Sequence, residues 1–209
     1  MNHRSPFNSI TMTLIVVNVV FFLIALIFFG TSITSVALQP STILEGKGLW
    51  TFLTSMFMHA GLTHLLVNMI SLMFIGNFVE KLIGSKRFLW FYLGSGIFAG
   101  LFFVLISMIT GMDLNVYAVG ASGAIFGLGG LLAILTPRLP VLVFFIIPMP
   151  MWAAMIFLML VLWGLSLGAN LPIGNTAHLG GLIVGLIYGI YLKKKYPRRT
   201  KMISTYFSR

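Results

Sequence analysis

The sequence predicts an all-α integral membrane protein with about six transmembrane helices. Of the 209 residues, 59% are hydrophobic and only 8% are charged, and the mean hydropathy is +1.05. This composition is typical of polytopic helical membrane proteins. A bilayer core about 30 Å thick needs about 20 apolar residues per helix, so the chain with short connections is filled by these spans.

The first half of the chain predicts three spans, at about residues 10–29, 62–79 and 88–109. Residues 1–9 form a short polar lead, and the first span is longer than the apolar region of a signal peptide, so we expect a retained signal-anchor. Between the first two spans, polar residues and a proline interrupt any helix that could lie in lipid. We expect a loop there.

The second half predicts spans at about residues 120–135, 141–163 and 176–192. The fourth is short because a proline-rich segment follows it, and we expect Pro148 and Pro150 to kink the fifth. Residues 164–175 read as a polar connection. The interpretation is one six-helix membrane domain at residues 10–192, followed by a basic cytoplasmic tail at residues 193–209.

The formal net charge of +10 comes from residues at the ends of apolar runs and in the tail. No aromatic and basic residues alternate on a soluble face, so we expect no nucleic acid partner. Every lysine and arginine except Lys47 falls on one side of the predicted membrane. The positive-inside rule then predicts that both termini are cytoplasmic. We expect a multi-pass protein of the plasma membrane. The basic residues would meet anionic headgroups, and the oligomeric state stays open.

Three histidines, His59, His64 and His178, lie at or inside apolar segments, where ionisable groups usually have a function. A neutral histidine bonded to a backbone carbonyl between helices is the structural alternative. His59 and His64 are five residues apart and cannot share a helix face as zinc ligands do. The chain has three acidic residues and none lies well inside a span, which excludes an aspartyl dyad. We expect no metal and no cofactor.

Hydroxyl nucleophile chemistry remains, with Ser122 as nucleophile and His178 as its base. Without a buried carboxylate, this would be a two-residue dyad. Ser122 lies near the start of a short helix, where unpaired backbone N–H groups and the helix dipole stabilise a developing oxyanion. A helix-capping serine is the alternative interpretation of the same position.

Glycines spaced by four residues predict how the two helices meet. They are Gly123 and Gly127 in the fourth span, and Gly181, Gly185 and Gly189 in the sixth. Because Ser122 precedes one glycine face and His178 precedes the other, packing of these faces would place the two side chains at the same depth. The same glycines could instead pack against other helices.

His64 and Asn68 are four residues apart and share one face of the second span. Both side chains can donate hydrogen bonds, so they could complete an oxyanion hole with a backbone amide. The spacing leaves open which of His59, His64 and Asn68 lies closest to Ser122.

The motifs at residues 59–68, 120–123 and 177–185 together resemble the rhomboid family of intramembrane serine proteases, over about residues 10–192. The resemblance implies a six-helix rhomboid-like bundle. It implies that Ser122 is the nucleophile and His178 the base. It also implies that His64 and Asn68 donate to the oxyanion together with the Ser122 amide, and that Gly120 belongs to the same oxyanion site.

The resemblance also implies supporting residues. His59 would orient the loop before the second span, Phe126 would pack on the catalytic histidine, and Gly123 and Gly181 would allow the helices to approach. The family often has Trp-Arg nine residues before the first histidine. Here Trp50 fits and Thr51 replaces the arginine, which questions how the loop is anchored.

The implied function is cleavage of transmembrane segments of other proteins, with no cofactor. A water-accessible cavity, a mobile cap at about residues 164–175 and lateral substrate entry near the second and fifth spans accompany it. One alternative is a non-catalytic rhomboid-like protein that binds membrane clients. Another is a small transporter, whose polar residues would line both halves of the bilayer.

Overall fold

The computed structural model describes residues 9–29, 34–169 and 174–207. The protein is mostly helical, as expected. Its first helix is α1 (Ile10–Phe29), and two short helices follow in the first loop, α2 (Pro40–Leu44) and α3 (Thr51–Thr54). The second span is one continuous helix made of α4 (Leu62–Ser71), the π-helical segment η2 (Leu72–Gly76) and α5 (Asn77–Ile83).

The remaining elements complete the bundle. They are α6 (Ser85–Thr110), α7 (Ser122–Leu135), the strands β1 (Pro140–Val143) and β2 (Ile147–Pro150), α8 (Met151–Ala169), α9 (Asn175–Lys195) and α10 (Pro197–Tyr206). Among the described residues, five helices are long and apolar enough to cross a membrane, and α7 is a sixth, shorter apolar helix. The six-helix prediction is therefore broadly confirmed.

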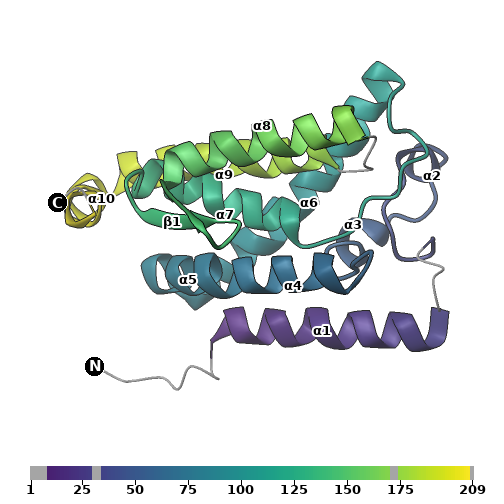
Figure 1. The fold of residues 1–209 in the computed structure, drawn as a ribbon, viewed down its shortest axis with the longest axis horizontal. Coiled ribbons are helices and arrows are strands. Elements are labelled where there is room, and N and C mark those ends of the chain that lie inside the picture. Colours follow the sequence, from purple (N-terminus) through teal and green to yellow (C-terminus); the bar gives the residue numbers. More distant parts are fainter. Residues whose placement is uncertain (1–8, 30–33, 170–173, 208–209) are drawn as a thin grey trace.

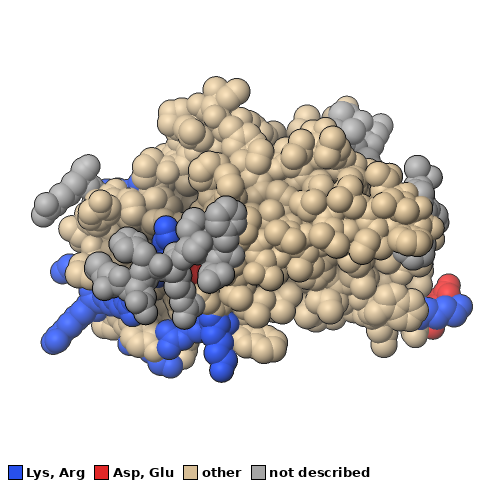
Figure 2. All heavy atoms as spheres, turned by 90° about the horizontal axis from the view of Figure 1, so that it is seen from below, with Lys and Arg blue, Asp and Glu red and all other residues tan. Residues whose placement is uncertain are grey.

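Helix α7 lies inside the bundle, between α4 on one side and α8 and α9 on the other (Figure 1). Residues 124–132 are all buried. A helix of 14 residues is too short to span a bilayer, but this one can be apolar throughout because other helices surround it. The start of α1 and helix α10 lie at the same end of the bundle (Figure 1). Lysines and arginines gather at one end of the molecule (Figure 2).

The prediction for the fifth span is wrong at both ends. Residues 140–150 form an antiparallel hairpin in which Pro140 pairs with Pro150, so Pro148 and Pro150 lie in β2 and kink no helix. Proline lacks the N–H that a helix interior needs, and the β-branched and aromatic residues between these prolines favour strands. The helix then runs to Ala169, so Gly164 is helical. Of the cap expected at residues 164–175, residues 164–169 are therefore helical, residues 170–173 lie outside the described residues, and Asn175 begins α9.

Other boundaries move by a few residues. The second span continues to Ile83, and α6 begins directly after Gly84, whose φ of 88° makes the turn. Helix α9 continues through the lysines at 193–195, and part of the expected tail forms α10. Lysine side chains at a helix C-terminus favour such an extension because they interact well with the helix dipole.

The first loop is fastened to the segment that precedes α7. Leu38 and Ala118 exchange two backbone hydrogen bonds of 3.0 and 2.8 Å, and the Gly120 N–H donates to the Ser55 carbonyl at 2.9 Å. Thr51, which stands where the family often has arginine, donates to the Gly48 carbonyl at 2.6 Å and is buried. The loop is thus anchored by a local turn at this position.

Glu80 holds α1 against the second and third spans. Its buried carboxylate accepts hydrogen bonds from the backbone N–H groups of Ile10 (3.0 Å) and Thr11 (2.9 Å). It also accepts from the hydroxyls of Thr11 and Ser85, both at 2.7 Å. The carboxylate therefore caps the N-terminus of α1, where a negative charge is favourable.

We predict that Glu80→Gln lowers the free energy of unfolding by about 2 kcal/mol. The substitution removes charge-assisted hydrogen bonds, and it points the amide NH2 group at N–H and O–H groups that are themselves donors. Unfolding in detergent micelles, followed by circular dichroism, measures the change. Glu45→Gln is the matched control, since Glu45 pairs with Lys47 on the surface, where side-chain exposures are 62% and 72%. Equal stability of the two variants would contradict the assigned role of Glu80.

Candidate active site

Ser122 and His178 lie in direct contact although 56 residues separate them. Ser122 Oγ is 2.8 Å from His178 Nε2, a hydrogen-bond distance. Ser122 is the first residue of α7, and Ala121 takes the N-cap position without a side-chain cap bond. The serine hydroxyl therefore bonds the histidine and does not cap its own helix, which argues against the capping interpretation.

Helices α7 and α9 approach so closely that their glycines cannot be replaced without movement. A Cβ atom on Gly181 would overlap the carbonyl of Gly123, and one on Gly185 would overlap the carbonyl of Gly127. The Cβ atom added to Gly185 would also lie 2.9 Å from the Leu131 nitrogen. These are backbone atoms that cannot rotate away, so the glycine face of α9 packs on the backbone of α7.

The glycines of α7 serve two neighbours. A Cβ atom added to Gly123 would lie 2.8 Å from the Ala99 Cβ atom of α6. One added to Gly127 would lie 2.7 Å from the Ser95 Cβ atom of the same helix. Gly130, which is not among the glycines predicted at this contact, also faces the α9 backbone, because a Cβ atom added to it would lie 2.5 Å from the Leu182 carbonyl oxygen. Its place seven residues after Gly123 is the signal that could have identified it.

Gly120 shapes the backbone just before the serine. Its φ of 117° lies in the region that favours glycine, and a Cβ there would be 2.8 Å from the ring atoms Cε1 and Nε2 of His64. The same point is 3.7 Å from Ser122 Oγ. The His64 ring and the serine hydroxyl thus flank the Gly120 backbone.

The three polar residues of the motif at residues 59–68 have different places around the dyad. The His64 ring is the one that contacts Gly120, and the His59 ring meets it edge-on with centroids 5.1 Å apart. Asn68 is buried, and its amide donates to the His64 carbonyl at 2.8 Å. Burial, with a smaller effect from His64, lowers the pKa of His59 to about 4, so His59 is neutral at pH 7.

His178 is held by packing. Its ring stacks on Phe126 with centroids 4.7 Å apart and an interplanar angle of 20°. Its Nδ1 atom is buried and has no hydrogen-bond partner in the described part of the chain. Phe126 is four residues after Ser122, so one helix supplies both the hydroxyl and the ring that orients the histidine.

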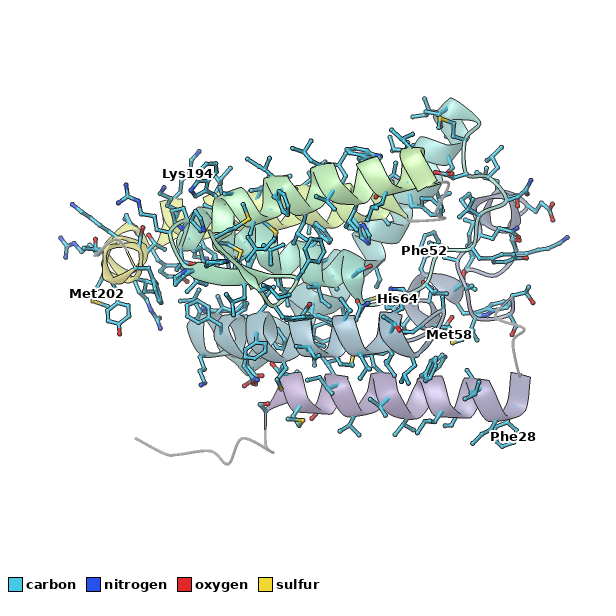
Figure 3. The ribbon with its side chains drawn as sticks, in the orientation of Figure 1. Phe28, Phe52, Met58, His64, Lys194 and Met202 are labelled. Atoms are coloured by element: carbon cyan, nitrogen blue, oxygen red, sulfur yellow. The ribbon has the colours of Figure 1, made fainter. Side chains whose placement is uncertain are left out.

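The candidate site lies in the half of the bundle away from the basic end. His64 projects into the interior between α4 and α7, far along the bundle from Lys194 (Figure 3). Within the described residues, no three His, Cys, Asp or Glu side chains gather as metal ligands would. The chemistry available here is that of a hydroxyl, imidazoles and backbone amides.

Comparison of the sequence with known proteins points to one family. The Rhomboid domain model matches residues 46–195, which include both motifs of the dyad. The protein named "Putative rhomboid protease YdcA" from Bacillus subtilis (strain 168) is 33% identical over 193 residues, covering 87% of this chain and 92% of that protein.

Two eukaryotic relatives are similar over the core. "Rhomboid protein 1, mitochondrial" from Saccharomyces cerevisiae is 33% identical over 69% of this chain and 42% of that protein. "RHOMBOID-like protein 5" from Arabidopsis thaliana is 33% identical over 75% of this chain and 48% of that protein. This chain matches less than half the length of these two relatives. The family model and these identities together establish that the chain belongs to the rhomboid family.

Proposed function

We propose that this protein is an intramembrane serine endopeptidase that cleaves transmembrane segments of other membrane proteins through a Ser122–His178 dyad. The family includes intramembrane serine proteases, and one relative carries a protease name. The single observation that carries the proposal is the 2.8 Å contact between Ser122 Oγ and His178 Nε2. A serine with an imidazole at this distance can be activated as a nucleophile.

The proposed first step is attack of Ser122 Oγ on the carbonyl carbon of the scissile peptide. His178 Nε2 takes the hydroxyl proton while Nδ1 carries the ring hydrogen. The proton then passes to the leaving amine as the C–N bond breaks, which leaves an acyl-enzyme. Water deprotonated by the same nitrogen hydrolyses the ester and restores Ser122.

The negative charge that develops on the carbonyl oxygen needs donors. The first backbone N–H groups of α7 have no side-chain cap, so they are available at the serine. The His64 ring, beside Gly120, is the nearest side-chain donor, and the amide of Asn68 would be a second. We assign His64 and Asn68 to transition-state stabilisation together with the Ser122 backbone N–H. Gly120, whose own N–H donates to the Ser55 carbonyl, would shape the backbone beside this donor.

The remaining assignments support this chemistry. His59 would steady the His64 ring, Phe126 would orient His178, and Gly123 and Gly181 would set the separation of α7 and α9. The lone Lys47 on the far side supports a topology with both termini in the cytoplasm and the dyad in the outer half of the membrane. The plasma membrane remains our proposed location.

A non-catalytic client-binding protein is the second candidate function for a rhomboid relative. It would require the same bundle and would need no hydroxyl–imidazole contact. The distance between Ser122 and His178 favours catalysis over this candidate.

We predict that Ser122→Ala and His178→Ala each lower the cleavage rate of a reporter transmembrane substrate by at least about a thousandfold, because the two groups act as one unit. Gel analysis of the reconstituted protein with this substrate measures the rate. Ser107→Ala, at a buried serine of α6, is the matched control and should keep full activity. If the protein without substitutions bound the reporter substrate but left it uncut, it would be a client-binding protein, and the proposal would be refuted.

We predict that His64→Ala lowers kcat by about a hundredfold and changes KM little, because it removes a donor that acts in the transition state. Asn68→Ala should cost less, since its amide already donates to the His64 carbonyl. Kinetics on the same reporter separate kcat from KM. A His64→Ala variant with changed KM and normal kcat would assign His64 to substrate binding instead.

A further inference from the structure

A groove between α6 and α9 at the basic end of the bundle is unrelated to the dyad. One part, with a volume of about 500 Å³, is lined by Lys86, Arg87, Trp90, Phe91 and Tyr188. A second part, of about 510 Å³, shares its aromatic residues and continues along the two helices between Gly94, Phe98, Val184 and Ile187. Both volumes fall in the range of small-molecule sites, about 300–1,000 Å³.

The first part of the groove is positively charged without compensation. Lys86 and Arg87 form no ion pair within the described residues, where the ion pair found is Lys47–Glu45. Glu80, the nearest acidic residue in sequence, already accepts four hydrogen bonds from α1 and Ser85. Figure 2 shows this end of the molecule crowded with basic residues. An anionic group would complement the charge of this part of the groove.

The polar rim extends onto α9. Lys195 Nζ donates to the hydroxyl of Tyr191 at 2.7 Å, and the ring of Tyr188 stacks on Phe91 with centroids 4.6 Å apart. Tyrosine and tryptophan rings, apolar on one side and polar at the tip, are enriched where membrane meets water. The rim has the chemistry of a headgroup site.

The second part of the groove is apolar and open towards lipid. A Cβ atom added to Gly94 would have no other atom within 4 Å. In the same helix, the space beside Gly96 is occupied by Met56, and the space beside Gly100 is occupied by Leu38 and Phe52. From Lys86 to Phe98 an α-helix rises about 18 Å, close to the thickness of one half of a bilayer core of about 30 Å. The groove thus has the length of one acyl chain.

We infer that this groove is a binding site for one anionic phospholipid. Its phosphate would lie against Lys86 and Arg87, and an acyl chain would occupy the channel over Gly94. The inference is independent of the proposed protease function, because it uses no residue of the dyad. A transmembrane helix of a second copy is the competing occupant, and the experiment below distinguishes the two.

The experiment uses Trp90 as the reporter, since it lines both parts of the groove. The chain has four tryptophans, and replacing Trp50, Trp152 and Trp163 by phenylalanine leaves Trp90 alone. The protein is reconstituted in phosphatidylcholine vesicles that contain increasing fractions of either brominated phosphatidylglycerol or brominated phosphatidylcholine. We expect the relative association constant of phosphatidylglycerol over phosphatidylcholine, from fluorescence quenching, to be on the order of ten.

The Lys86→Gln/Arg87→Gln double variant should bring that constant close to one. Lys193→Gln/Lys194→Gln is the matched control, because it removes the same charge at the same end of the molecule from residues that do not line the groove. It should leave the preference nearly unchanged. Equal quenching by the two lipids, or an equal loss in both double variants, would overturn the inference.

Occlusion of the acyl channel gives a second test. Gly94→Leu should reduce quenching by both brominated lipids, while Gly164→Leu, at another helical glycine with open space, should not. The chain has no cysteine, so Ile187→Cys introduces a single thiol into the groove. Efficient disulfide dimers through Cys at this position, with no phosphatidylglycerol preference, would assign the groove to a second copy and overturn the lipid site.

Discussion

The close approach of α7 and α9 is the constraint on which the candidate site depends. Gly181 and Gly185 place the backbone of α9 against the backbone of α7, and no larger residue fits there. This contact, and not a third polar residue, brings Ser122 and His178 within hydrogen-bond distance. Helix α6 packs on the other side of the α7 glycines. The short buried helix that carries Ser122 is therefore held in place from two sides, by α6 and by α9.

Much of this arrangement could be predicted from the sequence because glycine spacing and apolar length are local signals. The glycine repeat after His178 predicted its helix partner, and the four-residue spacing of His64 and Asn68 predicted a shared face. The sequence could not predict which polar residue of the motif at residues 59–68 lies closest to Ser122. That ranking depends on the backbone at Gly120, which has a positive φ and whose N–H donates to the Ser55 carbonyl, a contact between distant segments.

The errors have equally physical causes. Residues 140–150 are as apolar as a membrane helix, so hydropathy alone extended the fifth span through them, although the prolines at 148 and 150 favoured a hairpin. The role of Glu80 could not be predicted, because nothing in the local sequence indicates that its carboxylate bonds Thr11, 69 residues earlier, at the start of another helix. The open groove beside Gly94 also emerged only from packing, since Gly96 and Gly100 carry the same sequence signal and are filled.

Covalent labelling of Ser122 by a fluorophosphonate tests most directly the claim that glycine packing assembles an activated serine. The account predicts labelling of the unmodified protein at Ser122, located by mass spectrometry. It predicts that Gly185→Val slows this labelling by about a hundredfold at unchanged helix content, because a displacement of about 1 Å misaligns the base. Gly164→Val, which meets open space, should label normally. Equally fast labelling of Gly185→Val would contradict the account.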